Sequence, residues 1–172
     1  FDWLLIAADG TAPTPLGSQA CVYDHVTGLL WSTETLGSAG RSLTWDAAMA
    51  AGATYSHCGL TDGWRLPTWR ELLSIVDFGA AAYASPSPAV ALNAYYFPNT
   101  SAGAYWTADE SAANPGAVAR VIRFDTGQSD FSAKSNTYSV RLVRTGRWCG
   151  RFAVALPCVL PDLPVNPNRA PL

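Results

Sequence analysis

The chain has 172 residues, of which 49% are apolar and 14% are charged, and its formal net charge is -2. This composition supplies a packed core for one domain and carries too little charge for a disordered chain. Lys134 is the single lysine and the arginines are scattered, so no basic stripe favours a nucleic-acid partner. No apolar run approaches the roughly 18 residues that a membrane-spanning helix needs, and we predict no membrane span.

Residues 1–19 are predicted to be an N-terminal extension, because a Pro-, Gly- and Ser-containing stretch separates their apolar start from the rest of the chain. An apolar start is unfavourable in water. We therefore expect its large side chains to dock on a neighbouring subunit. These predicted assembly contacts are Phe1, Trp3, Leu4 and Leu5.

Two helices are predicted in the first half of the chain. The first covers residues 44–51, with Asp46 in its first turn, where a carboxylate favours the helix dipole. The second begins at a capping box formed by Thr68 and Glu71. Apolar residues then recur at helical spacing, and Gly79 is expected to end this helix.

Short strands are predicted at residues 28–32, 104–107, 118–125 and 138–144. The turn sequence DTGQS after residue 124 predicts a hairpin between 118–125 and 130–134. The C-terminal half is therefore expected to be an antiparallel meander. Helices that precede a meander indicate the α+β class.

The compact domain is predicted to span residues 20–146, followed by a disulfide-bearing, proline-rich tail at 147–172. Prolines at the spacing found in this tail exclude a helix or a central strand and favour an extended path. The tail is a second candidate for docking on a neighbouring subunit, with Leu160 and Leu163 as its predicted contacts.

Four cysteines, an even number, allow two disulfides in any of three pairings: Cys21, Cys58, Cys149 and Cys158. We favour Cys149–Cys158, which closes a short loop, and by elimination Cys21–Cys58. The alternative is four free thiols in a cytosolic protein. No Cys-x-x-Cys pair occurs, so we predict no metal site at these residues.

A ligand site is predicted in the C-terminal half, where aromatic residues could line a groove for a sugar or peptide and four acids could converge. The candidates are Tyr105, Trp106, Asp109, Glu110, Asp125 and Asp130. No cofactor is predicted, and calcium is the one ion that the acids would suit if their oxygens converged. The alternatives are core packing for the aromatic rings and solvated loops for the acids.

No catalytic residues are predicted. The chain lacks a Gly-x-Ser-x-Gly motif and a Gly-rich phosphate loop. His57 stands next to Cys58, but adjacent side chains usually point apart, and a surface-loop histidine is the simpler interpretation. We therefore expect the protein not to be an enzyme.

Several segments together carry a family resemblance: TGLLW at 27–31, LTWDAA at 43–48, DGWRLPTWREL at 62–72, YFPNT at 96–100, YWT at 105–107 and YSVRLVR at 138–144. Their order resembles the bacterial domain family first catalogued as a domain of unknown function and found at the C-terminus of the Legionella collagen-like adhesin. The resemblance covers roughly residues 22–146. It implies a C-type-lectin-like fold, with two helices packed on small twisted antiparallel sheets, and more distantly a likeness to formylglycine-generating enzymes.

The resemblance also implies export and a role in adhesion or surface assembly. We expect a secreted, extracellular or cell-surface protein, with the periplasm as the alternative. The first hypothesis is a non-catalytic subunit of a bacterial filament, pilus or layer, with protein subunits or copies of itself as partners. The second is a carbohydrate-binding adhesin domain with a glycan partner. A formylglycine-generating type of oxidase is a distant third, because the late cysteines depart from the pattern of those enzymes.

Overall fold

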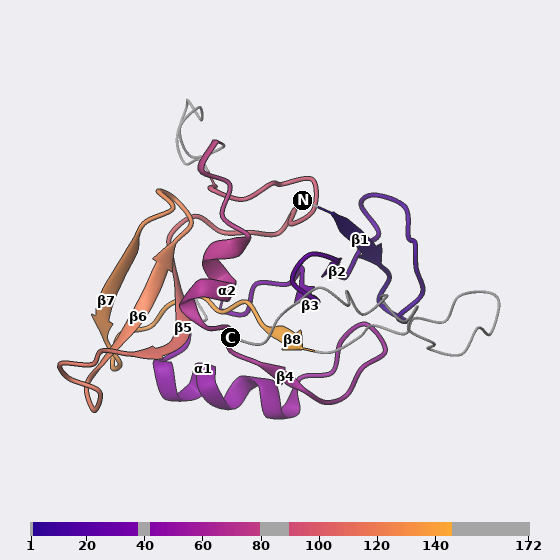
Figure 1. Cartoon of the computed structure of the whole chain (residues 1–172). Coiled ribbons are helices and arrows are strands. Elements are labelled where there is room, and N and C mark those ends of the chain that lie inside the picture. The colour runs from indigo at the N-terminus through magenta and orange to yellow at the C-terminus, as the bar shows by residue number, and fades with distance from the viewer. Residues whose placement is uncertain (1, 38–41, 80–89, 146–172) are drawn as a thin grey trace, which may run out of the picture.

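The protein is described by a computed structural model that covers residues 2–37, 42–79 and 90–145. It combines two α-helices with two antiparallel sheets (Figure 1), which is compatible with the α+β class. The larger sheet has the strand order β1-β2-β3-β8-β4. Its strands are β1 (Trp3–Ile6), β2 (Cys21–Asp24), β3 (Leu29–Ser32), β8 (Val143–Thr145) and β4 (Trp64–Arg65).

The smaller sheet contains β5 (Ala104–Glu110), β6 (Val118–Arg123) and β7 (Ser129–Ala133) in that order. The predicted hairpin is confirmed, since β6 and β7 pair with Val121 opposite Asp130. Its turn places Gly127 at a φ of 74°, a left-handed conformation that glycine adopts without strain.

The N-terminal segment is not a separate extension, and this prediction is wrong for residues 3–6. They form β1, which pairs antiparallel with β2 along its whole length, with Ile6 opposite Cys21. The ring of Trp3 also packs edge-on against Tyr96 and Phe97. Burial of Ile6 and these ring contacts attach the segment to the sheet. Phe1 lies outside the described residues.

The prediction of a C-terminal meander is also wrong for its last strand. Residues 138–140 form only isolated bridges, of which Leu43–Tyr138 and Leu36–Val140 are two. The chain then leaves the small sheet and enters the large one as β8, between β3 and β4. The last predicted strand therefore joins the two sheets and does not extend the smaller one.

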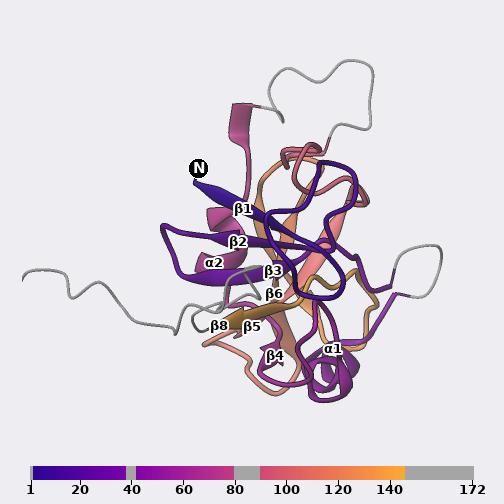
Figure 2. The same ribbon diagram turned by 90° about the vertical axis from the view of Figure 1, so that its right-hand side faces the viewer.

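The helices lie on either side of the joined sheets, as Figures 1 and 2 show. Helix α1 (Trp45–Ala51) continues into a short 3-10 turn, η1 (Gly52–Thr54), and α2 (Trp69–Ser74) begins at the predicted capping box. Helix α2 is shorter than predicted, because Ile75 already forms its C-cap. No helix in the described ranges is both long enough and apolar enough to cross a membrane.

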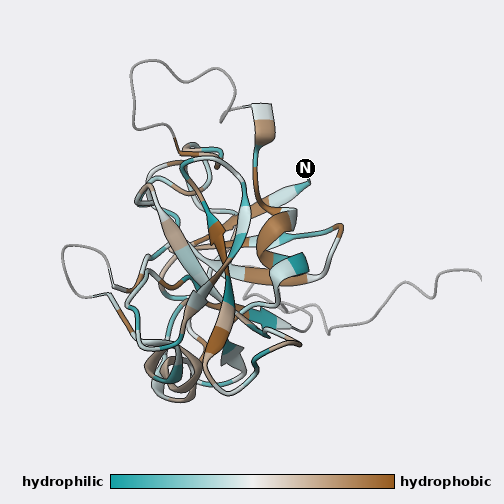
Figure 3. Cartoon of the chain, turned by 90° about the vertical axis from the view of Figure 1, so that its left-hand side faces the viewer, coloured by the Kyte–Doolittle hydropathy of each residue, from teal (hydrophilic) through white to brown (hydrophobic). Residues whose placement is uncertain are grey.

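Two hydrophobic clusters fill the spaces beside the sheets. One contains Trp45 of α1 together with Leu30 and Trp106, and the other contains Leu72 of α2 together with Trp31 and Tyr105. Successive residues of β3 and β5 thus enter different clusters, as the alternation of a strand requires. In Figure 3 the ribbon of α2 is brown in one part and teal in another, in keeping with a helix that places Leu72 in the second cluster and keeps polar residues elsewhere.

Candidate functional site

The two aromatic residues of the predicted groove belong to the core. Tyr105 and Trp106 are both 0% exposed. The Trp106 indole Nε1 donates a hydrogen bond to the carbonyl of Leu43 (2.8 Å), and the Tyr105 hydroxyl donates to the carbonyl of Ser101. The prediction of a surface groove is wrong here, because β5 is covered on both faces.

The four acids of the predicted site each have a separate local partner. Asp109 accepts from the backbone of Trp69, Glu110 pairs with Lys134, Asp125 pairs with Arg123, and Asp130 accepts from the backbone of Phe131. No three of these carboxylates come together in the described part of the chain. The converging oxygens that calcium requires are therefore not assembled from these acids.

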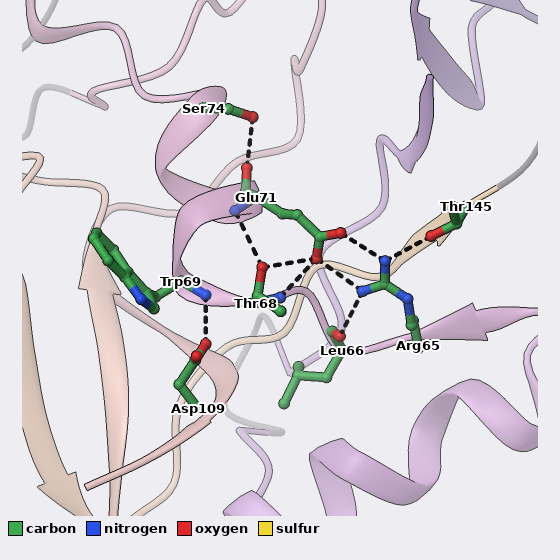
Figure 4. Close-up of polar contacts among 8 residues, drawn as sticks. All are labelled: Arg65, Leu66, Thr68, Trp69, Glu71, Ser74, Asp109 and Thr145. Carbon is green, nitrogen blue, oxygen red and sulfur yellow. Dashed lines mark hydrogen bonds and ion pairs between the residues drawn. The ribbon is translucent and has the colours of Figure 1, made fainter. Parts of the chain in front are cut away.

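The start of α2 is tied to its surroundings by a polar network centred on Glu71 (Figure 4). Arg65 donates from Nη1 and Nη2 to the two carboxylate oxygens of Glu71, at 2.8 and 2.6 Å. The same carboxylate accepts from the backbone N–H of Thr68 and completes the capping box. Arg65 also donates to Thr145 in β8.

The pKa of the Glu71 carboxyl reflects opposing effects. Burial acts to raise this pKa, but the hydrogen bonds from Arg65 and Thr68, together with the Arg65 charge, hold it below its usual value. The hydrogen bond with Glu71 raises the pKa of Arg65 in turn. Both groups are therefore charged at neutral pH, and their role is to fix α2.

Beside this network, arginines and aromatic rings alternate on the surface. The guanidinium carbon of Arg120 lies 5.1 Å from the centroid of the Trp69 ring and 4.3 Å from that of the Phe131 ring. Arg70 lies 5.5 Å from the Trp69 ring. Phe131 is 44% exposed. We call Trp69, Arg70, Arg120 and Phe131 the arginine–aromatic face.

The sequence interpretation missed this face because it comes from three elements, α2, β6 and β7. One signal could have found part of it. Arg120 and Phe131 are cross-strand partners in the predicted hairpin, and partners of this kind share one face of the sheet. The position of Trp69 over Arg120 depends on tertiary packing.

Arg141 is a second buried centre, with no exposed surface. It donates to the carbonyl of Ser32 (2.7 Å) and to the hydroxyls of Thr100 (2.8 Å) and Thr35 (3.1 Å). Burial lowers the pKa of Arg141 to about 10. None of the carboxylates in the described ranges forms an ion pair with it. Arg141 thus joins separate segments of the chain through its hydrogen bonds.

The predicted disulfide between Cys21 and Cys58 is present. The ring of His57 is half-buried, with one nitrogen within 4.8 Å of both sulfur atoms. This corrects the interpretation of His57 as a plain surface-loop residue. The other predicted disulfide, Cys149–Cys158, lies outside the described residues.

Some of the predicted assembly contacts lie in the described part of the chain, and the others lie outside it. Trp3, Leu4 and Leu5 are half-buried in β1 and pack against the two hydrophobic clusters. Their apolar surface is thus partly used within the domain. Leu160 and Leu163 lie outside the described residues.

The described core coincides with a known family. The family model of the Lcl C-terminal domain matches residues 20–144. The chain belongs to this family. The match includes α2 with its capping box, the arginine–aromatic face and Arg141, and it leaves out β1. Membership of this family is consistent with a surface module related to adhesins. No curated protein matches the chain.

Proposed function

We propose that this Lcl C-terminal domain is a non-catalytic binding module of a bacterial adhesin, exposed outside the cell, and that it contacts its ligand through the arginine–aromatic face. The observation that carries the proposal is the position of Arg120 between the rings of Trp69 and Phe131. A C-type-lectin-like arrangement of the two sheets is part of the same proposal.

The chemistry of this face favours an acidic saccharide. An arginine held between aromatic rings loses little side-chain freedom on binding, and its planar N–H groups match a carboxylate or sulfate. The exposed edge of Phe131 adds apolar surface for a sugar ring. The four acids once considered for calcium are engaged elsewhere, so binding should not require calcium.

Binding can be tested on a glycan array, with calcium and with a chelator. We expect acidic glycans to bind equally well in both conditions. Replacement of Arg120 by glutamine should weaken binding at least tenfold, which corresponds to about 1.4 kcal/mol. The matched control is Arg123→Gln, because Arg123 lies on the same strand but pairs with Asp125. Strict calcium dependence, or equal losses in the two variants, would contradict the proposal.

A second candidate function, assembly by strand addition, is favoured by β7. This strand is the edge of the small sheet, and its even-numbered residues bond to β6, as the Lys134–Ala117 hydrogen bond and the strand register indicate. The backbone N–H groups of Ser129 and Ala133 therefore point away from the sheet, as does that of Phe131, which already donates to the Asp130 carboxylate. An exposed edge of this kind can pair with another chain.

Assembly can be tested by sedimentation of the full chain. Ala133→Pro removes an outward N–H and should abolish strand addition while β6 and β7 stay paired, whereas Ala133→Ser keeps that N–H. Deletion of residues 147–172 tests the tail separately. Deletion of residues 1–19 is not a clean test, because it removes β1 from the sheet. Equal association of all variants would contradict docking through β7 and through the tail.

A further inference from the structure

We propose that Cys21, His57 and Cys58 form a zinc site when the disulfide between the two cysteines is reduced. The site shares no residue with the arginine–aromatic face and has a different chemistry. The proposal therefore does not rest on the proposed function. It uses residues that the sequence spacing did not suggest, because Cys21 and Cys58 are 37 positions apart.

The three ligand atoms are already close together. Both sulfur atoms and one nitrogen of the His57 ring lie within 4.8 Å of one another. Tetrahedral zinc, with bonds of about 2.0–2.3 Å, separates its donor atoms by roughly 3.3–3.8 Å. Small side-chain rotations can therefore convert the disulfide arrangement into a metal site.

The backbone around the site is held by contacts other than the disulfide. His57 and Leu60 exchange two backbone hydrogen bonds, of 2.9 and 3.0 Å, across the loop that carries Cys58. Cys21 starts β2, which is paired on both sides. The two segments should thus keep their positions when the sulfur–sulfur bond is broken.

The His57 imidazole is held in place by its neighbours. Its Nε2 lies 3.1 Å from the carbonyl oxygen of Ala20. Because a carbonyl can only accept, Nε2 carries the proton, and Nδ1 of the neutral ring keeps the lone pair that a metal binds. Metal-binding histidines usually donate their second N–H to such a carbonyl. The rings of Tyr55 and Trp64 pack against the imidazole and limit its rotation.

The charge balance suits a buried site. A dithiol reductant transfers two electrons and two protons to the disulfide, forms two thiols and becomes a disulfide itself. Zinc then displaces the two thiol protons. Two thiolates, a neutral imidazole and Zn²⁺ have no net charge, which favours burial of Cys21 and Cys58 at 0% and 1% exposure. Water takes the fourth position. Zinc and the disulfide thus join the same two segments in different redox states.

The test uses the full chain with Cys149→Ser and Cys158→Ser, so that two thiols remain. The protein is reduced with dithiothreitol, freed of reductant without oxygen and titrated with Co²⁺ as the probe. We expect one Co²⁺ per chain, thiolate-to-cobalt charge-transfer absorption in the near ultraviolet, and displacement by Zn²⁺. His57→Ala should weaken Co²⁺ binding at least about tenfold, whereas His25→Ala, the matched control, should not.

Three results would overturn the proposal: no charge-transfer absorption in the reduced chain, equal Co²⁺ affinity in the two histidine variants, or equal binding by the oxidised chain. Near-ultraviolet circular dichroism covers the case in which the reduced chain unfolds. Zinc should then restore the native spectrum of the chain with His57 and not that of His57→Ala. A chain that stays unfolded with zinc would also overturn the proposal.

Discussion

The polar network at the start of α2, which we call the anchor of α2, stabilises the fold in two ways. Substitutions at Glu71 can separate these two contributions. Glu71→Ala removes one of the two capping-box hydrogen bonds, that from the Thr68 backbone N–H to the Glu71 carboxylate, worth about 1 kcal/mol, and also the ion pair with Arg65. Because the Arg65 side chain is 39% exposed, we assign that pair only about 0.5 kcal/mol. Glu71→Gln keeps an amide oxygen that can accept from Thr68, and loses the charge and the second acceptor oxygen of the pair with Arg65. The expected losses in the free energy of unfolding are thus about 1.5 kcal/mol for alanine and about 0.5 kcal/mol for glutamine.

The charged part of this stabilisation depends on pH in a known direction. The folded-state pKa of Glu71 is lowered, so the folded protein binds fewer protons at this carboxyl than the unfolded chain does. The stabilisation is fully present above the unfolded pKa of a glutamate and is lost as the pH falls through the lowered folded pKa. The difference between wild type and Glu71→Gln should therefore be largest at neutral pH and vanish in acid.

Urea unfolding at several pH values measures both quantities, and thermal melts give a second reading. A domain of this size shifts its Tm by roughly 2–4 °C per kcal/mol, so Glu71→Ala should lower the Tm by about 3–6 °C. Equal losses for alanine and glutamine at neutral pH would show that the cap contributes nothing. A wild-type advantage over glutamine that grew in acid would refute the assigned direction of the pKa.

Three further substitutions test buried contacts by the same unfolding assay. Arg141→Met leaves the acceptors at Ser32, Thr35 and Thr100, two of them in buried residues, without their donor and should cost about 3 kcal/mol. Gly52→Ala should prevent native packing, since a Cβ there would clash with the Trp64 carbonyl oxygen, whereas Gly116→Ala, with open space around it, should be neutral. Trp45→Phe removes the bond from Nε1 to the buried Thr107 carbonyl (2.9 Å) and should cost about 1–3 kcal/mol.

The elements that the sequence predicted well are those specified by neighbouring residues. The capping box needs only Thr68 and Glu71, three positions apart, and the hairpin of β6 and β7 needs only its turn. Helix α1 likewise follows from a short local pattern. Local chemistry determines each of these structures before the rest of the chain is considered.

The features that the sequence did not predict depend on partners far away in the chain. Strand β1 is four residues long and becomes a strand only by pairing with β2. Strand β8 pairs Thr145 with Leu29, a contact that no local pattern specifies. Tyr105 and Trp106 were predicted to line a groove from their aromatic side chains, and residue type alone does not show whether a ring is covered. Both faces of β5 are covered, by α2 on one side and α1 on the other.

The anchor of α2 also explains why the arginine–aromatic face can serve as a binding surface. Arg65 ties the start of α2 to β8 in the large sheet through Thr145, and Asp109 ties the backbone of Trp69 to β5 in the small sheet. The Trp69 ring is therefore positioned by both sheets before any ligand arrives. A surface held in this way loses little conformational entropy on binding, so more of the contact energy is retained as affinity. In the proposed calcium-independent binding, this rigidity would take the place of a bound ion in organising the surface.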